Sequence, residues 1–276
     1  MMSELNDEEE KYEHHNRSYI SSEVRLEQYY TIENMIEKSG GFGKLQVWIL
    51  IWMLIASIPS AFYSHGLPVL EQFPDYTCIT SSGHKYRWSR NEICFKGRPR
   101  TDIKWEIDWD SGRSIKNWIH EMNLMWLHKY KIGMFGATYF IGMALSGIFL
   151  KFSDHFGRKI MIQAGCLFSW FTVFYLYVFE DIYSRYALLF ILGVLSFRLV
   201  TLYILMMELV PKEYQIYVSA GYAIIDHYIA VIVPSVYFRF IGKDYKVIFI
   251  IAVIAAPISF ILSLLLPESP TYYYEK

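Results

Sequence analysis

The sequence has few of the residues that mark a soluble enzyme or a nucleic-acid-binding protein. It contains only three cysteines and no Cys-x-x-Cys pair, so no metal site is expected from the spacing of Cys and His. It has no phosphate-binding loop, dinucleotide fingerprint or nucleophile elbow, and we expect neither enzymatic activity nor a cofactor. The net charge of -1 argues against the basic face that a nucleic-acid partner requires.

The first 44 residues also lack the basic segment and short apolar stretch of a cleavable signal peptide. They are polar, with an acidic run at 8–10. Apolar residues recur at near-helical spacing over 24–38, which predicts a short amphipathic helix lying on the membrane surface or on a partner protein. No presequence identifies the membrane, so the plasma membrane and an organelle membrane such as the mitochondrial inner membrane both stay open.

What the sequence does have is long apolar runs. It is 54% hydrophobic, and a bilayer core about 30 Å thick needs roughly 20 apolar residues in helical form. Such runs predict an all-α integral multi-pass membrane protein, a six-transmembrane-helix bundle in contact with the lipid bilayer. The six expected spans are 45–70, 132–151, 160–179, 185–208, 216–238 and 246–266. Polar segments occupy 1–44, 71–131 and 267–276.

Three ionisable residues lie deep inside the expected spans. Arg198 is in the fourth span, and Asp226 and His227 are in the fifth. Antiparallel spans joined near residue 212 would hold Arg198 and Asp226 at similar depth, and a lone charge there costs several kcal/mol. We therefore predict a contact between them, direct or through His227 or water. The Arg198–Asp226 pair would either fix the packing of the two spans or face a partner protein, or else it would be a substrate or proton site. His65 in the first span is interpreted as a hydrogen-bonded core histidine.

Six sequence blocks, each placed next to an apolar run, resemble the organic cation and anion transporter branch of the major facilitator superfamily. Each block alone is weakly specific, and their common order carries the resemblance. The blocks are Ile36–Gln46, Phe73-Pro74 with Cys78, Glu121 with Asn123 and Leu124, Ser153–Lys159, Glu208–Val210 with Tyr214, and Pro267–Pro270.

The resemblance implies one half of a major facilitator fold, a 3+3 inverted repeat with cytoplasmic termini and residues 71–131 outside. It also implies an inner-face loop motif of charged residues and one glycine. These are Asp154, Gly157, Arg158, Lys159, Glu208 and Glu268. Leu150 stands where the family has glycine, and basic residues that the family places after Tyr214 and after Pro270 are absent. We therefore expect a weakened inner-face charge network.

Cys78 and Cys94 share the segment that the resemblance places outside. A disulfide between them is predicted, because disulfides persist on an oxidising side of a membrane. No Asn-x-Ser/Thr glycosylation sequence occurs between 71 and 131. This absence weakens a cell-surface interpretation.

Two functions fit these features. In the first, the chain is a degenerate half-transporter that serves as a structural or accessory subunit of a larger membrane assembly. We favour this hypothesis, because the chain stops where a full transporter would continue and because family charges are missing. In the second, it transports small organic ions as a homodimer or with a separate second half. The ordered family blocks and the intramembrane charges favour that alternative.

Overall fold

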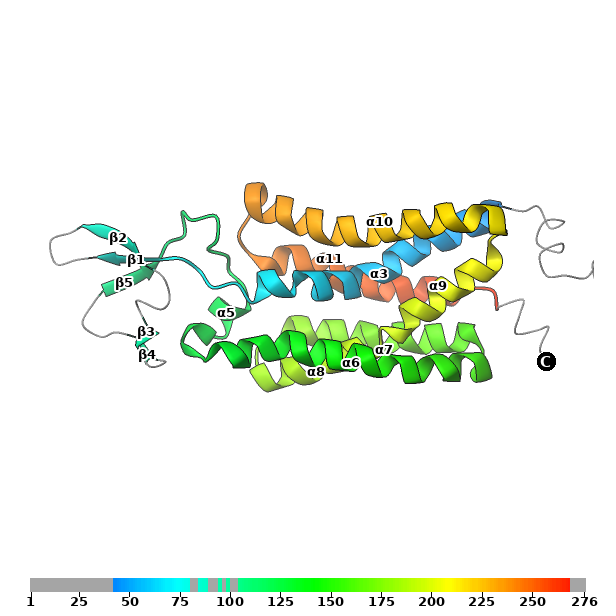
Figure 1. Ribbon diagram of the computed structural model, residues 1–276, viewed down its shortest axis with the longest axis horizontal. Coiled ribbons are helices and arrows are strands. Elements are labelled where there is room, and N and C mark those ends of the chain that lie inside the picture. Colours follow the sequence, from blue (N-terminus) through cyan, green and yellow to red (C-terminus); the bar gives the residue numbers. More distant parts are fainter. Residues whose placement is uncertain (1–41, 80–83, 89–93, 96–97, 100–103, 269–276) are drawn as a thin grey trace, which may run out of the picture.

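The computed structural model describes residues 42–79, 84–88, 94–95, 98–99 and 104–268. It is a long helical bundle with a small β-structure beyond one end (Figure 1). We call that end the sheet end. We call the opposite end, where the described chain both begins and finishes, the tail end. The predicted amphipathic helix at 24–38 lies outside the described residues.

Six spans in the described part of the chain are long and apolar enough to cross a membrane. The prediction of an integral multi-pass membrane protein is therefore confirmed. The fourth span is divided between two helices, and the fifth is extended by a π-helical turn. The helices are α3 (Lys44–Leu70), α6 (Lys129–Phe156), α7 (Arg158–Val178), α8 (Ile182–Val194) with α9 (Phe197–Leu209), α10 (Lys212–Val236) with η2 (Tyr237–Ile241), and α11 (Tyr245–Ser263).

Local chemistry explains where several helices begin and end. Gly157 separates α6 from α7 with φ of 98°, a backbone conformation that only glycine adopts without strain. Asp181 and Asp244 precede α8 and α11, and their carboxylates accept backbone N–H bonds from Ser184 (2.9 Å) and Lys246 (2.9 Å). Pro211 precedes α10, where its missing N–H costs no helical bond.

The all-α prediction is incomplete for the segment between the first two spans, because this segment contains β-strands. Strands β1 (Tyr76–Ile79), β2 (Lys85–Trp88) and β5 (Lys104–Ile107) form an antiparallel sheet of order β2-β1-β5. Strands β3 (Cys94–Phe95) and β4 (Arg98–Pro99) form a separate antiparallel pair. The short helices α5 (Trp118–Glu121) and η1 (Leu124–Trp126) then lead into α6. The sequence did not predict this sheet, because its strands are too short to give a clear alternation of polar and apolar residues.

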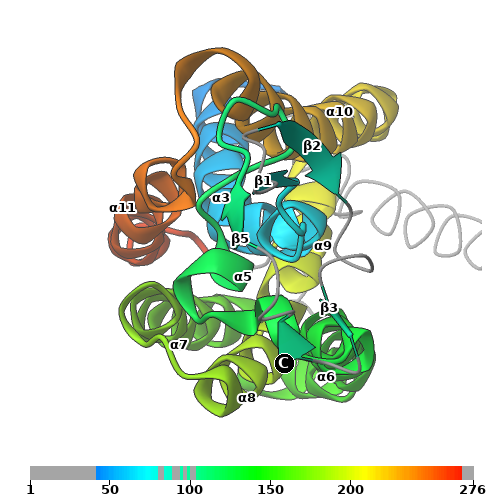
Figure 2. The same ribbon diagram turned by 90° about the vertical axis from the view of Figure 1, so that its left-hand side faces the viewer.

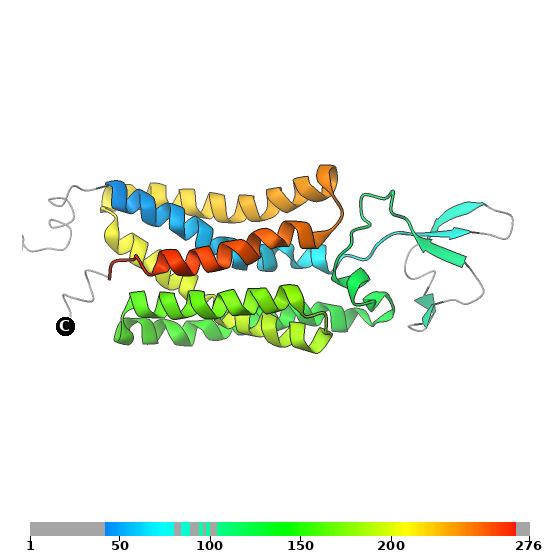
Figure 3. The same cartoon turned by 180° about the vertical axis from the view of Figure 1, so that it is seen from behind.

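The membrane helices form two groups when the bundle is seen from the sheet end. One group holds α3, α10 and α11, and the other holds α6, α7 and α8 (Figure 2). The main contacts within the groups pair α3 with α10 and α11, and α8 with α6 and α7. Between the groups, α11 packs on α7, and α9 crosses to reach α3 (Figure 3).

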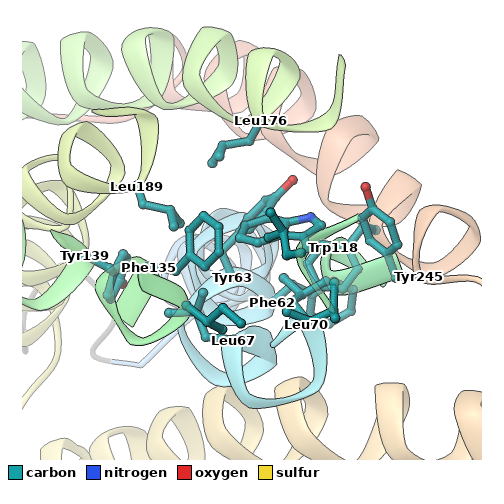
Figure 4. Close-up of a cluster of buried hydrophobic side chains, with 14 of the residues drawn as sticks. Phe62, Tyr63, Leu67, Leu70, Trp118, Phe135, Tyr139, Leu176, Leu189 and Tyr245 are labelled. Carbon is teal, nitrogen blue, oxygen red and sulfur yellow. The ribbon is translucent and has the colours of Figure 1, made fainter. Parts of the chain in front are cut away.

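Two buried apolar clusters fill the bundle. The cluster toward the sheet end includes Phe62, Trp118 and Phe135, so the segment after the sheet is packed into the bundle (Figure 4). The second cluster, toward the tail end, includes Trp52 and Leu205. On α3 the first cluster begins at Ala61 and the second ends at Ala56. The stretch of α3 between them is where the polar groups of the bundle interior gather.

Candidate functional site: an intramembrane polar centre

The fourth span breaks at its middle. Helix α8 ends at Val194 and α9 begins at Phe197, with Leu195 and Ser196 between them. The break is bridged by tighter bonds of the i to i−3 type, including Ser196 N–H to Gly193 O (3.1 Å) and Arg198 N–H to Leu195 O (3.2 Å). Discontinuous helices near the midplane line substrate and ion sites in transporters. The sequence predicted one continuous span here, because the residues of the break, Leu195 and Ser196, are common in membrane helices and no proline interrupts the apolar run.

Arg198 lies beside this break and is buried, with 2% of its surface exposed. Its guanidinium donates one hydrogen bond to the Ala56 carbonyl (2.8 Å) and one to Ser60 Oγ (2.8 Å), both on α3. Gly165 of α7 packs against the arginine stem so closely that an added Cβ would lie 2.7 Å from Arg198 Cβ. Arg198 Nε has no hydrogen-bond partner among the described residues. The side chain therefore ties α9 to α3 without a carboxylate.

Asp226 lies nearby on α10. No direct hydrogen bond or ion pair joins it to Arg198 in the described part of the chain, so the direct form of the predicted pair is not seen. Electrostatic interactions link both charges to Tyr139 and Tyr222, which places them around one polar region. A contact through water or His227 stays a prediction.

Asp226 has two histidines for neighbours. His227 Nδ1 lies 3.9 Å from Asp226 Oδ2, and the His227 ring stands 5.2 Å from that of His65 on α3. One ligand atom from each of the three residues lies within 4.8 Å of the others. Asp226 Oδ1 is buried and, among the described residues, has no hydrogen-bond partner. We call Arg198, Ser60 and these three residues the polar centre. The sequence flagged His65 but did not bring it to Asp226, because helix pairing is not readable from one sequence.

The inner-face motif predicted from the resemblance is brought together at the tail end. Arg158 forms an ion pair with Glu208 and lies 3.7 Å from Asp154 Oδ1. The backbone N–H of Lys159 donates to Glu268 Oε1 (3.1 Å). Both glutamates therefore have partners in the turn itself. The expectation of a weakened network, drawn from the missing basic residues, stays a prediction about the transport cycle.

A second charged cluster, at the sheet end, was missed by sequence reasoning. Arg185 of α8 is fully buried and donates to Glu121 Oε2 (2.9 Å), with its guanidinium 4.5 Å from the centre of the Trp118 ring. Tyr245 also donates to Glu121, and Lys246 pairs with it. The available signals were a charged residue at the start of two expected spans, Arg185 and Lys246, and Glu121 in the polar segment between the first two spans. Burial would raise the pKa of Glu121, but these hydrogen bonds and the Arg185 charge outweigh burial and lower the pKa to about 2.

The predicted disulfide is not decided. Cys78 is buried in β1, where its backbone pairs with Tyr86 and Trp105. The backbone of Cys94 is part of β3, but its side chain lies outside the described part of the structure. The Cys78–Cys94 bond therefore stays a prediction.

No protein-family model matches the chain, and no curated protein is similar to it. The resemblance to the major facilitator superfamily thus rests on the ordered sequence blocks. The six apolar spans stand independently of that resemblance.

Proposed function

We propose that this chain is a six-helix body of the major facilitator type that serves as a structural subunit of a larger membrane protein assembly. Its helix packing supports the first part of the proposal. Helix α3 packs on α10 and α11 as the α8–α9 span packs on α6 and α7, and α7 packs on α11. An inverted repeat that exchanges the first three spans with the last three would produce this main set of contacts.

The second part rests on the surface of α10. This helix makes its main interhelical contact with α3 and is the least covered of the spans. Its exposed surface carries Tyr217 and Tyr228, and His227 has 64% of its side chain exposed at the middle of the span. Lipid-facing positions of α11 are instead occupied by Ile250, Ile254 and other aliphatic residues. We call this surface of α10 the open face.

Polar side chains at the midplane are unstable against lipid tails, and they normally face protein or a water-filled cavity. The open face carries an imidazole beside a half-buried carboxylate, whereas the exposed large apolar residues of α11 are all aliphatic. Burial of the open face by another membrane protein removes this cost. A partner helix with small or polar residues would also supply hydrogen bonds across the interface.

The test is photo-crosslinking in the native membrane. A photo-crosslinking amino acid at Tyr228 on α10, which is 59% exposed, is compared with one at Ile254 on α11, which is 55% exposed. We expect Tyr228 to capture a different membrane protein and Ile254 to capture lipid. Gentle detergent extraction should then recover the chain in a larger particle. Recovery as a homodimer of twice 32.6 kDa, about 65 kDa, with self-crosslinks only, would refute the subunit proposal.

A second candidate function is transport of small organic ions, and the broken fourth span favours it. The break lies at Arg198, a buried cation without a direct carboxylate partner in the described structure. Uptake by membranes that contain the chain and its native partners tests this candidate. Substrate flux that is lost in Arg198→Gln, with normal assembly of the variant, would establish transport. Assembly with no chain-dependent flux of organic ions would leave the structural role.

A further inference from the structure

We infer that His65, Asp226 and His227 form a binding site for a divalent transition-metal ion of the Zn²⁺ type, between α3 and α10. Two imidazoles and a carboxylate are a donor set that suits zinc. The inference rests on side-chain geometry alone and does not depend on whether the chain is a subunit or a transporter.

The three side chains already converge. One ligand atom from each of the three residues lies within 4.8 Å of the ligand atoms of the other two. Ligands at about 2.1 Å from a tetrahedral zinc stand about 3.4 Å from each other. Side-chain movements of up to about 1.4 Å therefore bring the set to coordinating distance.

Two further observations point to a ligand at this place. Asp226 Oδ1 is buried and unpartnered within the described residues, which is costly for a carboxylate unless a cation or donor meets it. His227 Nδ1 lies 3.0 Å from the Ala223 carbonyl, which can only accept, so Nδ1 carries the proton and Nε2 keeps its lone pair. Metal-binding histidines are commonly fixed in this way by a backbone carbonyl.

The position of the group gives an ion there a physical consequence. Because α10 makes its main interhelical contact with α3, an ion held by His65 on one helix and by Asp226 and His227 on the other would fasten α10 to the bundle. The exposure of His227 leaves a fourth coordination position toward the open face, for water or a partner's side chain.

The experiment is a titration of the purified full chain with Zn²⁺, followed by isothermal calorimetry, and with Co²⁺, followed by absorption. Because the tail holds an adjacent histidine pair, all proteins carry His14→Ala and His15→Ala and no polyhistidine tag. We expect one ion per chain, and a loss of affinity in His65→Ala and in Asp226→Asn that exceeds the roughly 10- to 100-fold cost of removing a second-shell partner. His155→Ala, at the tail end of α6, is the matched control and should bind normally.

A gain-of-signal variant covers the case in which those substitutions impair folding. In His227→Cys, at an exposed position, a thiolate replaces the imidazole, and Co²⁺ should acquire a sulfur-to-cobalt charge-transfer band that the parent protein lacks. Absence of Zn²⁺ binding by the parent, equal binding by the His65→Ala variant, or no new band in His227→Cys would each overturn the inference.

Discussion

Replacing Glu121 by Gln perturbs the sheet-end cluster at its centre while keeping the size of the side chain. Glu121 accepts from Arg185 and Tyr245 and pairs with Lys246, so one carboxylate joins α5, α8 and α11. The amide keeps one acceptor oxygen but removes the negative charge. Arg185, which is fully buried, is then left without its counter-charge.

The size of the effect follows from the pKa of Glu121. Its lowering from 4.5 to about 2 corresponds to roughly 3 kcal/mol of stabilisation of the charged form, at about 1.4 kcal/mol per tenfold change. Solvent at the membrane surface screens part of this interaction, and we expect about 2 kcal/mol to remain. Removal of one partner from a buried pair costs about 3–5 kcal/mol, because the other charge stays behind. The Glu121→Gln loss should therefore fall at about 2–4 kcal/mol.

The assay is equilibrium unfolding of the full chain in detergent across pH. Because the folded pKa of Glu121 is below its unfolded value, its stabilisation is complete above about pH 4.5 and disappears as the pH falls toward 2. In Glu121→Gln, the free energy of unfolding should therefore change less between pH 4.5 and pH 2 than in the parent protein. Glu180→Gln is the control, since Glu180 lies at the edge of the same cluster, where it pairs with Lys246 (3.0 Å) and has 54% of its side chain exposed. The reasoning would be refuted by a Glu121→Gln variant that is as stable as Glu180→Gln and that loses as much stability between pH 4.5 and pH 2 as the parent protein.

Three further predictions test the packing, the tail-end motif and the disulfide. Gly142→Ala should cost about 1–3 kcal/mol in thermal unfolding, because its Cβ would meet the α8 backbone, whereas Gly147→Ala has open space and should be neutral or mildly stabilising. Arg158→Gln should lose about 1–3 kcal/mol with its two ion pairs, and an unfolding midpoint equal to that of the parent would contradict their contribution. Peptides holding Cys78 and Cys94 should stay linked in mass spectrometry until reduction, and reduction should remove roughly 3 kcal/mol. Complete alkylation of both thiols without reductant would count against the disulfide.

The membrane-spanning helices were the part of the fold that the sequence predicted best, because long apolar runs mark them. A run such as 160–179 contains no charged residue, so its helix follows from the thickness of a bilayer rather than from subtle propensities. The break in the fourth span was missed because the residues at the break, Leu195 and Ser196, are ordinary in membrane helices. The small sheet was missed because its strands are four residues or fewer in length and have no long alternating pattern.

The candidate sites were predictable where chain neighbours form them and unpredictable where helix packing does. Asp154 and Arg158 belong to one short turn motif that the resemblance implied, and they lie together because they are neighbours along the chain. The contact of Arg198 with Ser60, 138 residues away, depends on how α9 crosses α3. The depth argument predicts a contact between Arg198 and Asp226, direct or through His227 or water, and only its direct form is absent from the described residues. Depth does not fix the rotation of a helix. In the fold, a carbonyl and a hydroxyl of α3 reach the guanidinium instead.

Three arginines of the described bundle, one at each end and one in the centre, have different kinds of partner. Arg185 at the sheet end and Arg158 at the tail end each bind a carboxylate directly. Arg198 in the centre is held by neutral acceptors, while Asp226 keeps a buried oxygen without a partner among the described residues. A satisfied pair gains little from a ligand, since the ligand would have to displace a partner that is already optimal. An unneutralised charge in a low-dielectric interior gains most from a new counter-charge. The polar centre therefore differs from both ends of the bundle, because no carboxylate binds its arginine directly among the described residues.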